Sequence, residues 1–297
     1  MTAWVAAVEG TEAGHDAALI LALAAAFLHA LFGALQKGGY DPWTSRTAID
    51  VGLLVLSAPV ALLLVPWPPL ALWWLLAGMV AIHFVYKALM AMSYARGAYT
   101  VVYPVVRGTG PVFTVLGAGL VFGETFTAWQ WAGVGLLVGG MFGLSAYNLR
   151  KITVGRETLV PALGLAVATG LMVALYTTWD AYGIRAVEDP FTFLAWFFFL
   201  TAFDFPLIAL ARGRWRRPEP ALVRLALGGA VVAFGSFGCV MMATRLDAVG
   251  EAAVLRETSV VFAALIGWLW LRESVGPRRI ALMALIALGA VVVEIGG

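Results

Sequence analysis

Long apolar runs alternate along the chain with short polar segments. The first run, from Ala17 to Gln36, is long enough to cross the hydrocarbon core of a bilayer as a helix. The pattern continues to the end of the chain, and we predict membrane-spanning helices near residues 17–36, 47–65, 71–94, 98–122, 128–147, 158–180, 191–211, 221–244, 248–271 and 278–295. These runs are apolar throughout instead of alternating in polarity, which favours helices over the strands of a membrane barrel.

The sequence also repeats itself. When Arg107 is aligned with Arg256, further charged residues coincide, namely Arg96 with Arg245 and Glu124 with Glu273. Near the same offset, Asp41-Pro42-Trp43-Thr44 resembles Asp189-Pro190-Phe191-Thr192. Charged matches are rare in so apolar a chain. We therefore predict a short polar N-terminus (1–16), a first five-helix repeat (17–148), a linker (149–157) and a second five-helix repeat (158–297).

The odd number of helices in each half has a topological consequence. After five crossings the second half starts from the opposite side of the membrane, so the two repeats should be inverted. Inverted repeats are typical of transporters, with a substrate site near the middle of the membrane between the halves. The predicted fold class is an all-α polytopic membrane protein, with ten transmembrane helices in two inverted five-helix repeats around a central cavity.

Composition excludes several other classes of protein. Of the 297 residues, 62% are hydrophobic and only 12% are charged, far from the roughly 25% charge of soluble domains. The mean hydropathy is +0.91. A net charge of +2 gives no basis for nucleic-acid binding. The single cysteine, Cys239, excludes a disulfide framework or a cysteine-based zinc cluster.

The basic residues of the loops predict the orientation in the membrane. The odd-numbered loops carry most of them, including the cluster Arg212, Arg214, Arg216 and Arg217, whereas the even-numbered loops carry only Arg185 and Arg245. The positive-inside rule then places the odd loops in the cytoplasm and both termini outside, on the periplasmic side of an inner (plasma) membrane. We interpret the cluster from Arg212 to Arg217 as a topology signal and not as a ligand site.

Two related segments carry a family resemblance. They are Val105-Val106-Arg107-Gly108-Thr109-Gly110-Pro111 through Gly123-Glu124, and Leu255-Arg256-Glu257-Thr258 through Arg272-Glu273. With the ten spans, this pattern resembles the EamA-type exporters of the drug/metabolite transporter superfamily, and within it most closely the bacterial amino acid exporters, including those for aromatic amino acids. The resemblance implies a basket of helices around a central cavity and alternating access by rocking of the halves. Such exporters are often drawn with cytoplasmic termini, in contrast to the orientation predicted from the loop charges.

Ionisable residues within the spans are costly in hydrocarbon and therefore mark candidate sites. His83 and Lys87, four residues apart, share one helix face. The substrate-binding candidates are His29, His83, Tyr86, Lys87, Tyr99, Tyr103, Arg107, Tyr176, Trp179, Asp180, Glu251 and Arg256. Arg107, Arg256 or Lys87 would hold a substrate carboxylate, and Glu251 or Asp180 an ammonium group. The alternative is that Arg107 and Arg256 are structural locks paired with Glu257 or Glu251.

These residues predict an exporter of amino acids, neutral or aromatic, that acts by alternating access. No acid lies in the 17–36 span, where the small multidrug members of the superfamily carry a glutamate, so we expect facilitated diffusion. The alternatives are proton-coupled efflux of drugs or other metabolites, with His83 as the titrating group, and an intramembrane enzyme using His83 with an acidic partner. We expect no catalytic residue, no cofactor and no metal, since a phosphate-binding loop and metal-ligand spacings are missing from the sequence. The expected partners are a small-molecule substrate and membrane lipid, with the protein acting as a monomer.

The fifth span suggests how one helix packs. Gly135, Gly139 and Gly143 recur at every fourth position and so share one face. Small residues in this spacing allow two membrane helices to approach closely. We predict that this face contacts a neighbouring helix.

Overall fold

The structure is a computed structural model, which describes residues 2–35, 40–97, 99–150, 156–215, 217–269 and 276–297. Within these ranges the chain is helical. The elements are α1 (Thr2–Val8), α2 (Glu12–Leu35), α3 (Pro42–Pro59), the π-helix η1 (Val60–Leu64), the 3-10 helix η2 (Leu70–Leu72), α4 (Trp73–Arg96), α5 (Tyr99–Phe122), α6 (Ala128–Leu149), α7 (Arg156–Arg185), α8 (Pro190–Thr201), α9 (Asp204–Ala211), α10 (Pro220–Leu246), α11 (Val249–Arg256), α12 (Ser259–Leu269) and α13 (Pro277–Ile295).

The prediction of ten spans is confirmed in part. Among the described residues, 8 helical stretches are long and apolar enough to cross a membrane. They are Glu12–Leu35, Pro42–Leu64, Leu70–Arg96, Val101–Phe122, Ala128–Leu149, Thr158–Arg185, Pro190–Ala211 and Pro220–Leu246. The region predicted as the ninth span is divided between α11 and α12, and the tenth, α13, has 19 residues and carries Arg278, Arg279 and Glu294.

The two sequence segments that resemble each other form the same helix cap. The Asp41 carboxylate accepts hydrogen bonds from the backbone N–H of Trp43 and of Thr44, both at 3.1 Å, where α3 begins. Asp189 accepts the equivalent bonds from Phe191 (3.2 Å) and Thr192 (3.0 Å) at the start of α8. Each aspartate satisfies backbone donors that the first helical turn leaves unpaired, and each is followed by a proline that needs no such partner.

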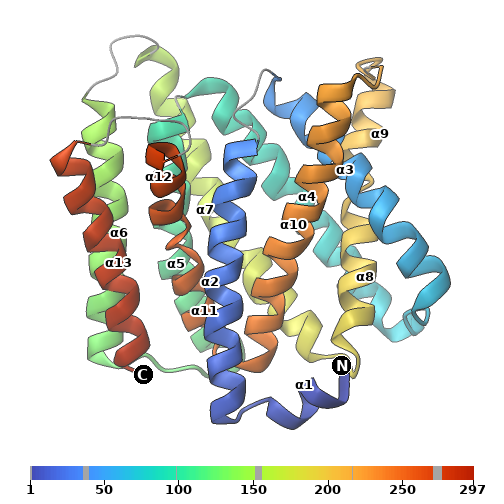
Figure 1. The fold of residues 1–297 in the computed structure, drawn as a ribbon, viewed down its shortest axis with the longest axis horizontal. Helices are drawn as coiled ribbons and strands as arrows, with labels where there is room; N and C mark the ends of the chain where they lie inside the picture. Colours follow the sequence, from blue (N-terminus) through green and yellow to red (C-terminus); the bar gives the residue numbers. More distant parts are fainter. Residues whose placement is uncertain (1, 36–39, 98, 151–155, 216, 270–275) are drawn as a thin grey trace.

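The two halves are interlocked. The first long helix, α2, packs against α10, α11 and α12, whereas α7 packs against α4 and α5. The first helix of each half is thus covered by the later helices of the other half. In Figure 1 both termini lie at the same end of the bundle, the end at which α2 begins and α7 finishes. The two helices therefore run in opposite directions.

The helix pair α6 and α13 lies at one edge of the bundle (Figure 1), and the predicted glycine face contacts α13 only at Gly143. Gly135 and Gly139 have no neighbour within 4 Å of where a Cβ would stand, whereas a Cβ on Gly143 would lie 2.7 Å from Leu282 Cδ2 of α13. A Cβ on Gly289 would instead lie 2.5 Å from the Leu137 backbone nitrogen, and one on Gly133 would lie 2.7 Å from the Gly289 carbonyl oxygen. The closest contacts between α6 and α13 are therefore at Gly133 and Gly289, which the four-residue spacing of the other glycines did not predict.

Two spans predicted as continuous helices are interrupted, and both breaks have a local cause. Pro206 has no N–H to donate to the carbonyl four residues earlier, and the seventh span is interrupted between α8 and α9. In the ninth region the Thr258 hydroxyl donates to the Leu255 carbonyl at 2.7 Å, and the Glu257 N–H donates to the Val254 carbonyl at 3.0 Å. These tight local bonds replace the regular ladder, so α11 ends at Arg256.

Candidate functional site

A histidine–aspartate pair joins the two halves inside the bundle. His83 Nε2 on α4 lies 2.7 Å from Asp180 Oδ2 on α7, and the two side chains are 5% and 4% exposed. The His83 ring centre lies 4.7 Å from that of Tyr176 and 4.9 Å from that of Phe197. The sequence indicated both His83 and Asp180 as candidates but did not indicate that they pair.

A second buried group lies at the break between α11 and α12. Glu257 Oε1 is 2.9 Å from Arg107 Nη1 and 3.5 Å from Arg256 Nη2, so one carboxylate bridges two guanidinium groups. Arg107 also contacts His29 of α2. This is the ion pair that the structural-lock interpretation predicts. It leaves the site with two positive charges against one carboxylate.

Aromatic rings connect the two groups into one cluster. The Arg256 guanidinium carbon lies 5.8 Å from the centre of the Tyr176 ring. The His83 ring packs against the same tyrosine. The Tyr86 ring centre is 4.8 Å from that of Tyr176. Tyr103 lies 5.4 Å from the Arg107 guanidinium carbon. We call His29, His83, Tyr86, Tyr103, Arg107, Tyr176, Asp180, Arg256 and Glu257 the central cluster.

Three atoms of the central cluster remain available to a ligand. Among the described residues, Asp180 Oδ1, Glu257 Oε2 and Arg256 Nε are buried and have no hydrogen-bond partner. Buried polar atoms without a partner are uncommon in folded proteins because each loses its hydration without compensation. The cluster thus offers two acceptors and one donor for a polar ligand.

Lys87 lies in a separate network, although it shares a helix face with His83. Its Nζ is 2.6 Å from Asp204 Oδ1 and 3.1 Å from Asp50 Oδ2. It also donates to the Thr201 carbonyl, at 2.6 Å, where α8 ends. Arg46 completes the network with a 2.8 Å contact to Asp50. Two cations therefore balance two carboxylates, in keeping with the cost of unpaired charge in the membrane.

Asp50 and Asp204 were not among the candidates predicted from the sequence. Each is an acid within a predicted apolar span, which is the signal that would have identified it. Their side chains are 0% and 10% exposed. Their partner Lys87 comes from another helix, so local spacing contains no sign of the pairing.

Three further candidates lie outside the central cluster. The Trp179 indole N–H donates to the Leu75 carbonyl at 3.0 Å and the ring packs edge-on against Trp74. Glu251 accepts a 2.5 Å hydrogen bond from the Gln130 amide. Tyr99 begins α5, and its side chain lies outside the described residues.

One group near the termini has ligand atoms close enough for a metal ion. Atoms of His15, Asp247 and Glu251 lie within 4.8 Å of one another. His15 Nδ1 is already bonded to Asp247, and its Nε2 lies 3.3 Å from Glu294 Oε1. Both ring nitrogens thus have acidic partners, and ordinary ion pairing accounts for this arrangement.

Comparison with known proteins assigns the family. The sequence matches the EamA-like transporter family twice, over residues 16–146 and 160–295. The chain belongs to this family. An EamA-family protein is a membrane transporter of small metabolites, so the protein is a multi-pass membrane protein, and the two matches agree with a two-repeat architecture.

A solved structure has the same fold. One crystal structure of a protein aligns with a TM-score of 0.69 over 95% of this EamA-family chain and 98% of that chain, at 18% sequence identity. Identity at this level supports a shared fold and nothing finer. A comparison with curated proteins gave no match.

Proposed function

We propose that this EamA-family protein exports neutral amino acids, aromatic ones foremost, across the inner membrane. The observation that carries the proposal is the set of open polar atoms in the central cluster. A zwitterion needs a cationic donor for its carboxylate and an anionic acceptor for its ammonium group. Arg256 Nε is an open donor, and Asp180 Oδ1 is an open acceptor.

The chemistry of the cluster suits such a substrate. A guanidinium group binds a carboxylate with directed, charge-assisted hydrogen bonds. Tyr176 contacts both Arg256 and His83 and so lies between the two poles of the proposed site. Aromatic rings there offer apolar contact to a side chain and attraction to an ammonium group. A hydrocarbon substrate would leave Arg256 Nε and Asp180 Oδ1 without hydrogen-bond partners.

The position of the cluster supports transport by alternating access. Its residues come from α2, α4 and α5 of the first half, and from α7, α11 and the turn after α11 of the second. Arg256 and Glu257 lie at a helix break, and interrupted helices form the substrate sites of many secondary transporters. Rocking of one half against the other would break the contacts between Arg107 and Glu257 and between His83 and Asp180. The cluster residues other than the half-buried His29 are buried, which corresponds to an occluded arrangement.

Orientation and energy source form part of the proposal. The basic odd-numbered loops favour a cytoplasmic location for those loops and an external location for both termini. The part of α2 from Ala17 to Leu35 contains no acid, which favours facilitated diffusion over the coupling used by small multidrug transporters.

Uptake into liposomes tests the proposal. Purified protein would be reconstituted and offered labelled aromatic, aliphatic, hydroxyl, basic and acidic amino acids, each with and without a pH gradient. We expect saturable uptake of neutral amino acids without a gradient. Arg256→Gln should reduce uptake at least tenfold, whereas Arg278→Gln, at the exposed start of α13, should not. Failure of every amino acid to enter would overturn the proposal.

Proton-coupled efflux is the second candidate, and the His83–Asp180 pair is the observation that favours it. An imidazole in direct contact with a carboxylate gives a proton-coupled transporter two groups that can bind a proton. Transport of organic cations that requires a pH gradient and is lost in His83→Gln would support this alternative over facilitated diffusion.

A further inference from the structure

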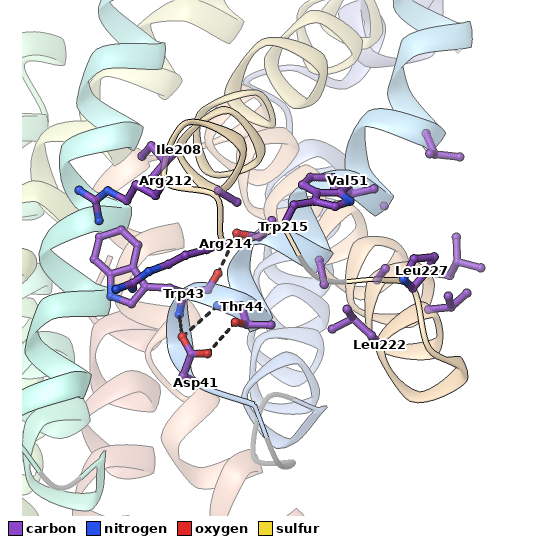
Figure 2. Close-up of a pocket in the computed structure, with 18 of the residues that line it drawn as sticks. Asp41, Trp43, Thr44, Val51, Ile208, Arg212, Arg214, Trp215, Leu222 and Leu227 are labelled. Carbon is purple, nitrogen blue, oxygen red and sulfur yellow. Dashed lines mark hydrogen bonds between the residues drawn. The ribbon is translucent and has the colours of Figure 1, made fainter.

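A groove opens on the side of the bundle between α3, the end of α9 and the start of α10. Its volume is about 790 Å³. Figure 2 shows its lining, with Asp41, Trp43, Arg212 and Arg214 gathered at one end and Val51, Leu222 and Leu227 farther along. None of the central-cluster residues lines this groove. It is thus a site separate from the proposed transport site.

Most of the groove lies along membrane-spanning helices and is apolar. Val51 and Val55 line it from α3, and Leu222 and Leu227 line it from α10. Val55 is 60% exposed and Leu227 is 47% exposed. Side chains exposed on the flank of a membrane span contact lipid chains. The groove is therefore open to the hydrocarbon of the bilayer.

The opposite end of the groove is cationic and aromatic. The Arg212 guanidinium carbon lies 5.6 Å from the centre of the Trp43 ring, which stacks on Phe205 at 5.2 Å. Arg212, Arg214 and Trp215 are exposed just beyond the end of the Pro190–Ala211 span. Tryptophan and arginine at the end of a span are typical of the headgroup region.

The two arginines have no acidic partner in the part of the chain that the structure describes. The acid in the lining is Asp41, whose carboxylate caps α3 and also accepts a 2.6 Å hydrogen bond from the Thr44 hydroxyl. Two arginines therefore face one carboxylate at this end of the groove, and the lining has an excess of positive charge.

We propose that this groove is a binding site for an anionic phospholipid. The phosphate would lie against Arg212 and Arg214, and an acyl chain would follow the apolar wall past Val51 and Val55. Charge at one end and hydrocarbon contact along the rest match a lipid and do not match a soluble anion. Basic pockets between membrane helices bind acidic lipid headgroups in this way. Arg212 and Arg214, which the sequence predicted only as part of a topology signal, would thus also bind a lipid headgroup.

Lipid titration of the purified protein tests the site. Delipidated protein in a non-ionic detergent would be titrated with phosphatidylglycerol, phosphatidylcholine or glycerol phosphate, and bound lipid would be counted by native mass spectrometry. We expect phosphatidylglycerol to bind at least tenfold more tightly than phosphatidylcholine and glycerol phosphate not to compete. Each arginine near a lipid phosphate contributes about fivefold in affinity, so R212Q/R214Q should weaken phosphatidylglycerol binding roughly 25-fold.

Two further variants separate the groove from general surface charge. R217Q/R224Q removes the same charge from exposed positions outside the lining and should change binding less than twofold. Val55→Trp fills the apolar part without altering charge and should weaken both lipids. Equal affinity for the two lipids, equal losses in the two arginine pairs, or competition by glycerol phosphate would each overturn the proposal. Lipid binding is measured without transport, so the result of this test does not depend on whether the protein exports amino acids.

Discussion

His83 and Asp180 form a contact that joins the third helical span to the sixth, with 2.7 Å between Nε2 and Oδ2. The two residues lie in different repeats, so any motion that separates α4 from α7 must break this pair. A buried ion pair or hydrogen bond of this kind is also costly to leave half-made. The pair is thus suited both to hold the halves together and to respond when a charged substrate competes for Asp180.

Removal of the His83 side chain tests this double role. We expect His83→Ala to lower transport at least tenfold while the protein remains folded, because Asp180 loses the group that positions it. His15→Ala, a histidine replacement outside the central cluster, is the control and should retain transport. Uptake in liposomes and thermal unfolding in detergent would be measured together. Transport at the wild-type rate in His83→Ala would contradict a functional role for the pair.

The Lys87 network predicts a stability effect that depends on its partners. Lys87→Met leaves Asp204 without its cation and Asp50 with Arg46 alone, and breaking such a pair costs about 3 kcal/mol. Replacement of Asp204 by Asn in the same chain removes the carboxylate that has lost its cation and should restore part of that loss. Unfolding of the single and double variants in detergent gives the comparison.

The same experiment tests the binding role that the sequence suggested for Lys87. A structural role predicts that Lys87→Met lowers the unfolding temperature and leaves the KM for substrate within twofold. Unchanged unfolding with a raised KM would contradict it and favour direct contact with substrate.

The helical spans and most of the central cluster could be predicted from sequence, for a physical reason. Apolar runs reflect the bilayer directly, and a charge inside such a run is rare enough to stand out, as with Arg107, Asp180 and Arg256. Pairing could not be predicted, because partners such as His83 and Asp180 are 97 positions apart. Their contact depends on how the helices pack, and no periodic pattern in the sequence indicates it.

The pattern of hydrophobic residues also did not predict where helices break or which faces pack together. A hydropathy profile does not distinguish a continuous span from one that is interrupted near Pro206. The interruption frees the Thr201 carbonyl that accepts a hydrogen bond from Lys87, so this bond could not be predicted. The glycine spacing of α6 identified a small-residue helix but not the side that meets α13. That choice depends on the partner helix, where Gly289 provides the space.

Gly289 gives a sharp test of the α6–α13 contact. A Cβ there would lie 2.5 Å from the Leu137 nitrogen, so Gly289→Ala must push the two helices apart. Overpacking of this kind costs about 1–3 kcal/mol. Gly135→Ala is the matched control, since nothing lies within 4 Å of its Cβ position. It should be neutral or stabilising by about 0.5–1 kcal/mol through helix propensity. Equal effects of the two variants on thermal unfolding would contradict the packing described for this pair.

The Asp189 cap predicts a pH-dependent contribution to stability. Partial burial opposes ionisation, but hydrogen bonds from the Thr192 and Thr2 hydroxyls and from the Phe191 and Thr192 amides hold the pKa of Asp189 below its usual value of 3.8. Because the folded pKa is the lower one, the stabilisation is complete above the unfolded pKa and is lost as the pH falls through the folded pKa. Asp189→Ala should therefore cost about 1 kcal/mol at pH 7. The difference from wild type should shrink toward zero when unfolding is measured at progressively lower pH below 3.8. A loss that is the same at pH 7 and in acid would show that the carboxylate charge contributes nothing to the cap.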